Sequence, residues 1–297
     1  MYNYNVKAKG GFVMKIKYFG TAAAEAVPAF FCSCDVCEKS RQAGGRNIRT
    51  RSQALIDVEL LIDFPADTYL HIMNYGLDLR NIKACLITHG HDDHIYPYDL
   101  MYRQSPVYSV FPNGGVGKVP LDIYITAKSS KELMRVIRKE HLFAKDKAAL
   151  SVNKIKKFVP FSACGYTVHP LRANHAKSLD PVIYIIEKGG KSLLYAHDTG
   201  LFPKDTWDYI EKSGIKLDFV SLDCTSTNRE KIKGTHLNLT GCVMIKERLI
   251  KNGNADENTV FCLNHFSHNG GYTYDELVPV AQEKGFLVSY DSMEVEF

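Results

Sequence analysis

Runs of apolar residues divide the chain into short strands and longer helical segments. Continuous or alternating apolar runs predict strands at residues 15–19, 54–63, 82–88, 122–126, 165–171, 182–187, 192–196, 217–222, 258–263 and 286–290. Apolar positions that recur every three to four residues predict helices at residues 66–74, 129–140, 205–212, 239–252 and 274–284. Helices follow strands in both halves, and this order predicts an α/β fold in which helices cover sheets.

The pattern shows no break that would divide the chain into two domains. Residues 1–13 precede the first predicted strand, and we expect them to form a flexible N-terminal extension. Residues 14–297 are then expected to form a single domain, since no Pro/Ser-rich linker interrupts them.

Composition and charge narrow the class of protein. Hydrophobic residues make up 45% of the 297 positions and charged residues 24%, which supports a sizeable core and argues against global disorder. A net charge of +4 is low for a dedicated nucleic-acid binder, although it would attract small anionic substrates. The chain has no apolar run long enough to span a membrane and does not begin with a signal peptide, so we expect a cytoplasmic protein without a membrane partner.

The densest group of chemically active residues follows the strand predicted at 82–88. The sequence HGHDDH at residues 89–94 places His89, His91, Asp93 and His94 in one turn. Polar groups concentrated at the end of an apolar strand need partners, and a divalent metal supplies them. Two of the histidines can face one position while Asp93 and His94 face a second, which suits two neighbouring metals. A solvated polar loop is the alternative interpretation.

This His-x-His-x-Asp-His motif resembles the signature of the metallo-β-lactamase superfamily. The resemblance implies a four-layer αββα sandwich, with two mixed sheets covered by helices, and three further ligands from later strand ends. His175, Asp198 and His265 follow apolar runs in the required order. By resemblance, one metal is bound by His89, His91 and His175, the other by Asp93, His94 and His265, and Asp198 bridges the pair. A surface histidine at 175 and a turn-capping aspartate at 198 are the alternatives for those two positions.

The implied chemistry is hydrolysis. Two metals about 3.5–4 Å apart lower the pKa of a shared water, so a bridging hydroxide rather than a side chain would be the nucleophile. The motif residue Asp93 is accordingly a candidate catalytic residue as well as a ligand. Imidazole ligands suit Zn²⁺, and the same mixture of nitrogen and oxygen donors also accepts Mn²⁺ or Fe²⁺.

A second group of metal-binding type lies near the N-terminus. Cys32, Cys34 and Cys37 stand within six residues, and three thiols of a Cys₃His zinc site need one imidazole. This C-x-C-x-x-C motif, together with His265-Phe-Ser-His268, resembles one subset of the superfamily, the phosphoribosyl cyclic phosphate phosphodiesterases of the carbon–phosphorus lyase pathway. The resemblance implies a structural zinc held by the three cysteines and His268. A redox or adventitious site with another cysteine as fourth ligand is the alternative.

The same subset suggests a role for His236. This histidine precedes the helix predicted at 239–252, in the sequence GTHLNLTG. By resemblance, His236 would bind the substrate phosphate and act as an electrophile or as a general acid toward the leaving alkoxide. A histidine that only caps the helix is the alternative.

The function expected from these features is cleavage of a small anionic phosphodiester, cyclic ones included, by a dinuclear metal hydrolase. The same ligand set would also serve a hydrolase of carboxyl esters, lactones or thioesters. An RNA-processing phosphodiesterase of the same fold would need a long basic arm, which the chain lacks, so nucleic acid is not the expected partner. A binding protein without turnover is the alternative outside enzymes, and a homodimer is compatible with the fold. The segment 101–120, which includes Arg103, is expected to form a lid or substrate wall.

Overall fold

Two mixed β-sheets pack face to face at the centre of the molecule. The structure, a computed structural model, describes residues 4–5, 11–103, 108–109, 120–139, 149–229 and 234–297. The first sheet has the order β1-β15-β2-β3-β4-β5-β6-β7 and the second β14-β13-β12-β11-β10-β9-β8. The strands of the first sheet are β1 (Tyr4–Asn5), β2 (Lys15–Gly20), β3 (Gln53–Ile56), β4 (Leu60–Ile62), β5 (Ala84–Leu86), β6 (Leu121–Thr126), β7 (Leu150–Ile155) and β15 (Glu294–Glu296). Those of the second are β8 (Phe161–Ala163), β9 (Tyr166–Arg172), β10 (Val182–Lys188), β11 (Lys191–Ala196), β12 (Phe219–Asp223), β13 (Val260–Asn264) and β14 (Leu287–Val288).

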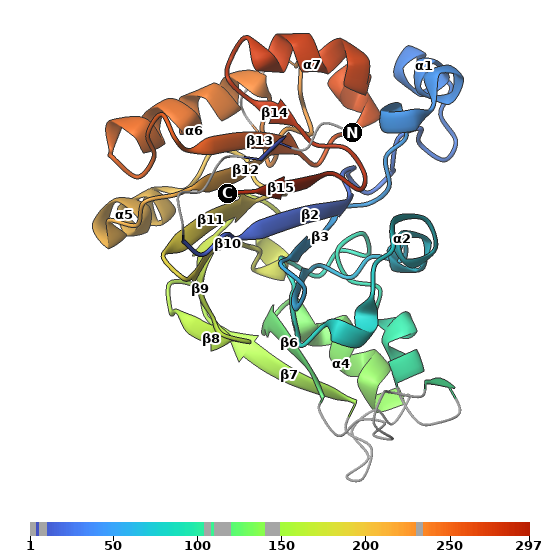
Figure 1. Cartoon of the computed structure of the whole chain (residues 1–297). Helices are drawn as coiled ribbons and strands as arrows, with labels where there is room; N and C mark the ends of the chain where they lie inside the picture. Colours follow the sequence, from blue (N-terminus) through green and yellow to red (C-terminus); the bar gives the residue numbers. More distant parts are fainter. Residues whose placement is uncertain (1–3, 6–10, 104–107, 110–119, 140–148, 230–233) are drawn as a thin grey trace.

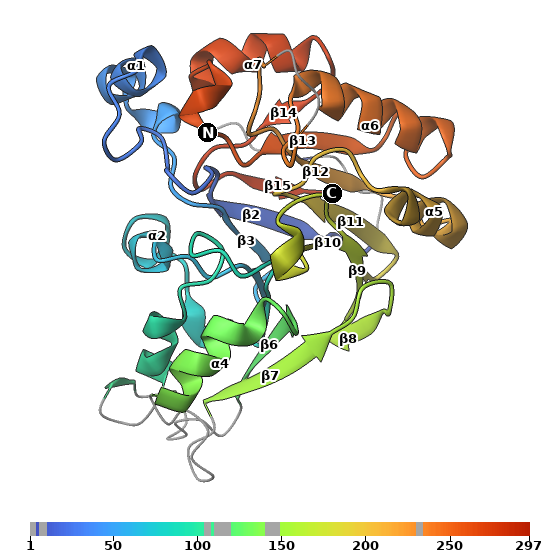
Figure 2. The same ribbon diagram turned by 180° about the vertical axis from the view of Figure 1, so that it is seen from behind.

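Helices cover the outer face of each sheet, which gives four αββα layers (Figures 1 and 2). Helices α5 (Lys204–Ser213), α6 (Leu239–Lys251) and α7 (Tyr274–Gln282) lie on the second sheet. Helices α2 (Thr68–Tyr75) and α4 (Ser130–Lys139) lie on the first. This architecture confirms the fold class expected from the sequence.

The apolar pattern of β10 shows why the sheets are buried on both faces. Ile183 and Ile185 pack in the core beneath α5–α7, whereas Tyr184 and Ile186 pack in the core between the sheets. Successive side chains of a strand point to opposite faces, so a continuous apolar run fits a strand covered on both sides. Burying each such apolar side chain stabilises the folded state by on the order of 1.5–3 kcal/mol.

The strand directions bring several strand ends to one edge. Strand β9 is antiparallel to β10, and β10 is antiparallel to β11, so β9 runs parallel to β11, β12 and β13. In the first sheet, β4 and β5 are also parallel. The carboxyl ends of parallel strands lie at the same edge of a sheet, which is where open α/β folds place their functional loops.

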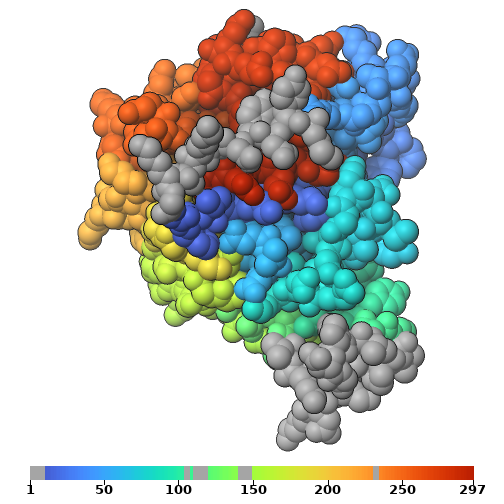
Figure 3. Space-filling view, viewed as in Figure 1, coloured from blue at the N-terminus to red at the C-terminus, as the bar shows by residue number. Residues whose placement is uncertain are grey.

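The two ends of the chain meet in the first sheet. Strand β15 pairs antiparallel with β2, and Figure 3 shows the C-terminal segments in red directly against the N-terminal segments in blue. Tyr4–Asn5 also pairs with β15, whereas most of the expected extension 1–13 lies outside the described residues.

The predicted helices are confirmed to within two residues at each end, but several strand predictions are wrong in detail. Residues 54–63 form a hairpin, β3 and β4, because Asp57 turns the chain with a φ of 51°. The sequence pattern also missed α1 (Asp35–Ala43), β7, β8 and β15. In the segment 101–120, residues up to 103 belong to the 3₁₀ helix η3 (Pro97–Arg103), and most of the remainder lies outside the described residues. Among the described helices, none is both long and apolar enough to cross a membrane.

Candidate metal centre

The first motif forms a tight turn directly after β5. His89 Nε2 lies 2.8 Å from His91 Nδ1, and His94 Nε2 lies 3.2 Å from Asp93 Oδ2. His89, His94 and Asp93 are buried. His89, Asp93 and His94 therefore face the interior of the molecule, whereas His91 is only partly buried.

Later strand ends bring three more side chains to this turn. Asp198 follows β11, and its Oδ2 lies 3.2 Å from His89 Nε2 and 2.8 Å from His94 Nε2. His175 follows β9, with Nε2 3.4 Å from His91 Nδ1. His265 follows β13, with Nε2 3.7 Å from Asp198 Oδ2. All seven predicted residues thus meet at one place.

The ligand atoms fall into two groups that share Asp198. In each group the possible ligand atoms all lie within 4.8 Å of one another. One group contains His89, His91, His175 and Asp198, and the other contains Asp93, His94, Asp198 and His265. These are the two sets that the sequence motif implied, with Asp198 in both.

The backbone is unusual at two of these positions. Asp198 has a φ of 53° and His265 a φ of 62°, in the left-handed region that non-glycine residues rarely adopt. Such conformations cost on the order of 1–3 kcal/mol and cluster at functional sites. Here they turn each side chain inward immediately after its strand.

Three buried polar atoms indicate that the cluster is built to hold cations. His94 Nε2, Asp198 Oδ1 and His265 Nε2 are buried, and although charged groups lie 2.8–3.7 Å from them, none of the three atoms makes a hydrogen bond with a described residue. Burying such atoms unpaired is costly, and divalent metals would supply the partners. Metal ions that bind imidazole nitrogen and carboxylate oxygen therefore fit the residues present.

The pKa shifts of His89 and Asp198 agree with this fit, whereas the carboxylates of Asp93 and Asp63 outweigh burial and raise the pKa of His94, so a metal there would displace a proton. Burial, aided by the neighbouring His94, lowers the pKa of His89, which favours the neutral imidazole that a metal binds. Burial acts to raise the pKa of Asp198, but His265 and His89 outweigh it, so the carboxyl stays ionised. Ionised carboxylates and neutral imidazoles are the forms that ligate metals.

His236 stands beside the second group. Its Nδ1 lies 3.2 Å from Asp198 Oδ1 and 3.1 Å from Asp223 Oδ2. Burial opposes protonation, but the Asp223 carboxylate outweighs it and raises the pKa of His236 to about 9. His236 also belongs to a further group of possible ligands, with Asp198, Asp223 and His265.

A cavity of about 350 Å³ is lined by five of the seven candidate ligands: His91, Asp93, His175, Asp198 and His265. His236 and Arg229 form part of its wall, and Glu25 contributes a carboxylate. The remaining lining residues include Ala23, Ala24, Thr225, Ser226, Ser267 and Asn269. The cavity is large enough for a small organic phosphate rather than a macromolecule.

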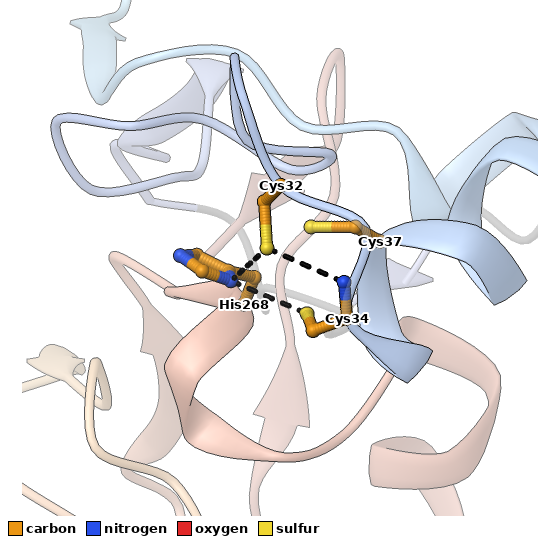
Figure 4. Close-up of side chains that lie close together, drawn as sticks. All are labelled: Cys32, Cys34, Cys37 and His268. Carbon is orange, nitrogen blue, oxygen red and sulfur yellow. Dashed lines mark hydrogen bonds between the residues drawn. The ribbon is translucent and has the colours of Figure 1, made fainter.

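A second cluster joins the N-terminal cysteines to the loop after β13 (Figure 4). His268 Nδ1 lies 3.4 Å from the Sγ atoms of both Cys32 and Cys34. Cys37 completes the group, whose ligand atoms lie within 4.8 Å of one another. The backbone N–H groups of Ala29 and Cys34 donate to Sγ of Cys37 and Cys32, at 3.3 and 3.4 Å.

The charge state of Cys34 suits a metal as well, whereas burial raises the pKa of the Cys37 thiol to about 12. Burial acts against ionisation of Cys34, but hydrogen bonds, with His268 the strongest, lower the pKa of its thiol to about 6. Thiolates are the form that zinc binds, and one imidazole with three thiolates is a common structural zinc set. The donor set therefore fits a zinc ion.

Comparison with known proteins places this site in a family. A family model described as "Beta-lactamase superfamily domain" matches residues 63–253, which include the first motif, His175, Asp198 and His236. The chain belongs to the β-lactamase superfamily. Its four-layer architecture is the metallo-β-lactamase fold of the hydrolases in that superfamily. A search of the curated proteins found no significant match.

Solved structures of superfamily members share the fold along nearly the whole chain. A new diphosphatase from the PhnP family matches with a TM-score of 0.71 and 21% identity, over 96% of this chain and 98% of that one. Zn²⁺-bound PqqB from Methylobacterium extorquens matches with a TM-score of 0.66 and 18% identity, over 95% and 99%. The short form of human tRNase Z gives 0.60 and 16%, over 95% and 98%. At sequence identities this low, the similarity shows a shared fold and nothing more.

Sequence reasoning missed two buried carboxylates that hold the superfamily motif in place. Asp63, directly after β4, lies with Oδ2 2.7 Å from His94 Nδ1 and accepts hydrogen bonds from the backbone N–H and hydroxyl of Thr88. Asp223, at the end of β12, contacts His236 and lies 3.5 Å from His265 Nδ1. Both follow apolar strands, as Asp198 does, and that shared placement was the available signal.

Two other side chains do not belong to the ligand groups. His197 is buried, with Nε2 2.7 Å from Ser221 Oγ. Arg103 donates to the carbonyl oxygen of Ala149 at 3.1 Å and lines a different cavity. Neither lines the cavity of the metal centre.

Proposed function

We propose that the protein is a metal-dependent phosphodiesterase that cleaves a small phosphodiester, cyclic ones included. The observation that carries the proposal is the shared position of Asp198, which belongs to both ligand groups and also contacts His236 at the wall of a small cavity. The Asp198 carboxylate would lie between the two metal positions, and the His236 imidazole beside it can carry a proton. This arrangement suits a reaction in which one oxygen attacks phosphorus while another leaves.

The ligands divide between two metal positions. His89, His91 and His175 would hold one ion, Asp93, His94 and His265 the other, and Asp198 would bridge them. Zinc or manganese suits this donor set, and iron is compatible with it. When bound, the metals supply a water activated for nucleophilic attack and Lewis-acid stabilisation of the charge on the phosphoryl oxygens.

The chain's own residues do the remaining work. His236, held by Asp223, donates a proton to the leaving alkoxide, and Arg229 on the cavity wall attracts the phosphate. Asp63 fixes the ring of His94, and Thr225 fixes that of His265 through a 2.8 Å contact between Oγ1 and Nδ1. These contacts orient the ligands before substrate arrives.

The cysteine cluster supports the same family of reactions. A structural zinc on Cys32, Cys34, Cys37 and His268 would tie the N-terminal loop to the loop that carries His265. Because metal binding contributes to the free energy of folding, the zinc would hold that loop in place. This arrangement resembles that of the phosphodiesterases of the carbon–phosphorus lyase pathway.

The test is a panel of chromogenic substrates. Protein loaded with Zn²⁺ or Mn²⁺ is expected to hydrolyse bis(p-nitrophenyl) phosphate faster than p-nitrophenyl phosphate, a lactone or a β-lactam. The Asp198→Ala variant is expected to lose this activity. Preferential cleavage of the lactone or of a thioester, with the metals verified in place, would contradict the proposal.

A further inference from the structure

One carboxylate on the wall of the metal-centre cavity is not a candidate ligand. Among the described residues that line this cavity, Asp93, Asp198 and Glu25 carry carboxylates. The two aspartates belong to the ligand groups, whereas Glu25 belongs to none of the groups of possible ligands found in the described part of the chain. The Glu25 side chain is partly buried, with 32% of its surface exposed. Its charge is therefore available to act on a molecule that binds in the cavity.

The turn that carries Glu25 is held against the loop after β13. The N–H of Ala23 donates to the carbonyl oxygen of Phe266 at 2.9 Å, and the N–H of Phe266 donates to that of Thr21 at 2.9 Å. Ala26 closes the turn, since its N–H donates to the carbonyl oxygen of Ala23 at 3.0 Å, and it has a φ of 62°. Non-glycine residues rarely adopt this left-handed conformation, and such residues cluster at functional sites. The backbone therefore fixes the position from which the Glu25 side chain extends.

Two side chains of the same loop hold the Glu25 carboxylate. The hydroxyl of Ser267 donates to Glu25 Oε1, and His268 Nε2 lies 3.6 Å from the same oxygen. The other ring nitrogen of His268 faces Cys32 and Cys34. A side chain that its neighbours hold in this way is positioned before a substrate arrives.

The charge of Glu25 reaches the end of the cavity where His236 stands. Burial opposes protonation of His236, but Asp223 outweighs it, and the pKa of His236 is raised to about 9. The charges of Asp198 and Glu25 add to this rise. Arg229 is the one arginine or lysine among the described residues that line the cavity. Glu25 offsets that cation, so the wall of the cavity carries little surplus positive charge of its own.

Phosphate monoesters and diesters differ in charge. At about pH 8 a monoester carries close to two negative charges, because its second pKa is about 6, whereas a diester carries one. Repulsion between like charges is stronger in a partly buried cavity than in bulk water, because the effective dielectric constant is lower. A fixed carboxylate on the cavity wall therefore disfavours the dianion more than the monoanion.

We infer that Glu25 determines specificity in this cavity, by favouring monoanionic phosphodiesters over dianionic phosphomonoesters. The inference rests on the proposed phosphodiesterase activity and identifies the residue that keeps the same centre from acting on monoesters. Glu25 acts through its charge, and Ser267 and His268 set the position of that charge.

Two esters that share a leaving group but differ in charge test the inference. These are methyl p-nitrophenyl phosphate, a monoanion at about pH 8, and p-nitrophenyl phosphate, a dianion. The metal-loaded parent protein is expected to prefer the methyl ester, and the ratio of the two kcat/KM values measures this preference. Glu25→Gln is expected to lower the ratio by about tenfold or more by raising kcat/KM for the monoester, since like charges repel strongly where the dielectric constant is low.

A second variant separates the charge of Glu25 from its position. Glu25→Asp keeps the charge and is expected to keep most of the preference, whereas Glu25→Gln keeps the length of the side chain and can still accept from Ser267. Glu247 is exposed on α6 and does not line the cavity. Glu247→Gln therefore controls for the loss of one carboxylate and is expected to keep the preference.

Several results would overturn the inference. One is a parent protein that cleaves the methyl ester without preferring it, and another is an unchanged ratio in Glu25→Gln. A ratio that falls only because cleavage of the methyl ester slows, or that falls in Glu25→Asp and not in Glu25→Gln, would show a positioning role without a role for the charge. Metal content, measured by inductively coupled plasma mass spectrometry, is expected to be equal in the parent and the variants. Loss of an ion from Glu25→Gln alone would assign the carboxylate to the cysteine cluster and overturn the inference.

A binding measurement separates failure of the inference from failure of the proposed function. If the parent protein cleaves neither ester, the proposed phosphodiesterase activity is wrong, and titration calorimetry at about pH 8 then tests Glu25 alone. Inorganic phosphate, mostly a dianion, is expected to bind metal-loaded Glu25→Gln about tenfold or more tightly than it binds the parent or Glu25→Asp, because the repulsion is removed. Dimethyl phosphate, a monoanion, is expected to bind the parent and Glu25→Gln equally. Equal affinity of inorganic phosphate for the parent and Glu25→Gln would overturn the inference.

Discussion

His265 and His268 lie three residues apart and face different clusters. His265 Nε2 lies 3.7 Å from Asp198 Oδ2 in the metal centre, whereas His268 Nδ1 lies 3.4 Å from the Sγ atoms of Cys32 and Cys34. One short loop after β13 therefore connects the candidate metal centre to the cysteine cluster. A metal at the cysteines would limit the motion of the loop that delivers His265.

The first prediction concerns the zinc at the cysteine cluster. Cys34→Ser is expected to lower the metal content by one ion per chain and to lower the melting temperature, because a structural zinc contributes to folding free energy. Metal content would be measured by inductively coupled plasma mass spectrometry, and Cys164→Ser, a thiol outside the cluster, is the control. Equal metal content in the two variants would show that the cluster binds no zinc.

Asp63 provides a second prediction. Asp63→Asn is expected to weaken metal binding at the centre about 10–100-fold, because the carboxylate that orients His94 is lost. Competition with a chromogenic chelator would measure the affinity. Asp57→Asn is a matched control, because Asp57 also follows a strand with a positive φ but lies outside the site. Unchanged affinity in Asp63→Asn would exclude an orienting role.

The role of His236 can be separated from metal binding. His236→Gln is expected to slow the release of alkyl leaving groups about 10²–10⁴-fold and that of p-nitrophenolate much less, since only a poor leaving group needs protonation. Metal content is expected to stay unchanged. A uniform loss across leaving groups would exclude the general-acid role, and the loss of one metal ion would identify His236 as a ligand.

A buried pair remote from the metals predicts a specific pH dependence. The hydroxyl of Thr50 lies 2.8 Å from His71 Nε2 and 2.6 Å from Asp291 Oδ2. Burial, partly offset by Asp67, lowers the pKa of His71 to about 4. Burial raises the pKa of Asp291 to about 6, although hydrogen bonds from Thr50 and the charge of Arg49 oppose it.

The two groups act on stability in opposite directions. The contribution of His71 is present above its unfolded pKa of 6.5 and is lost as pH falls toward 4. The contribution of Asp291 is present below its unfolded pKa of 3.8 and is lost as pH rises through 6. Each amounts to about 3 kcal/mol, so the two largely cancel between pH 4 and 6.

Single variants would show how each of the two groups makes the free energy of unfolding depend on pH. Urea unfolding of Asp291→Asn is expected to show a free energy of unfolding that falls on acidification from pH 6.5 to 4. His71→Gln is expected to show one that rises over the same range. Parallel pH profiles for the parent protein and both variants would exclude the compensation between His71 and Asp291.

Short-range patterns in the sequence predicted much of the fold and the centre. The first motif is contiguous. Asp198 and His265 each follow a largely buried strand that forms an apolar run, and His175 follows β9, which alternates less regularly. Because these strands are parallel, their carboxyl ends lie at one edge of the sheet and bring these residues together. For this reason the clustering of the candidate ligands and the helices other than α1 could be predicted.

Other features depend on contacts distant in the sequence. Asp63 becomes significant only because β4 pairs with β5 and brings it to His94. The hairpin at Asp57 lacks a Gly or Pro signal, since the side chain itself stabilises the turn by accepting from the Lys15 N–H at 2.9 Å. Helix α1 is short and polar, and its first turn carries Cys37, so the segment appeared only as a metal-binding loop.

The most direct test of the proposed dinuclear centre is anomalous diffraction from crystals soaked in Mn²⁺. Two manganese peaks are expected, one among His89, His91, His175 and Asp198, and one among Asp93, His94, Asp198 and His265. A second peak among Asp198, Asp223, His236 and His265, the competing ligand group, or a single peak at full soaking, would contradict it.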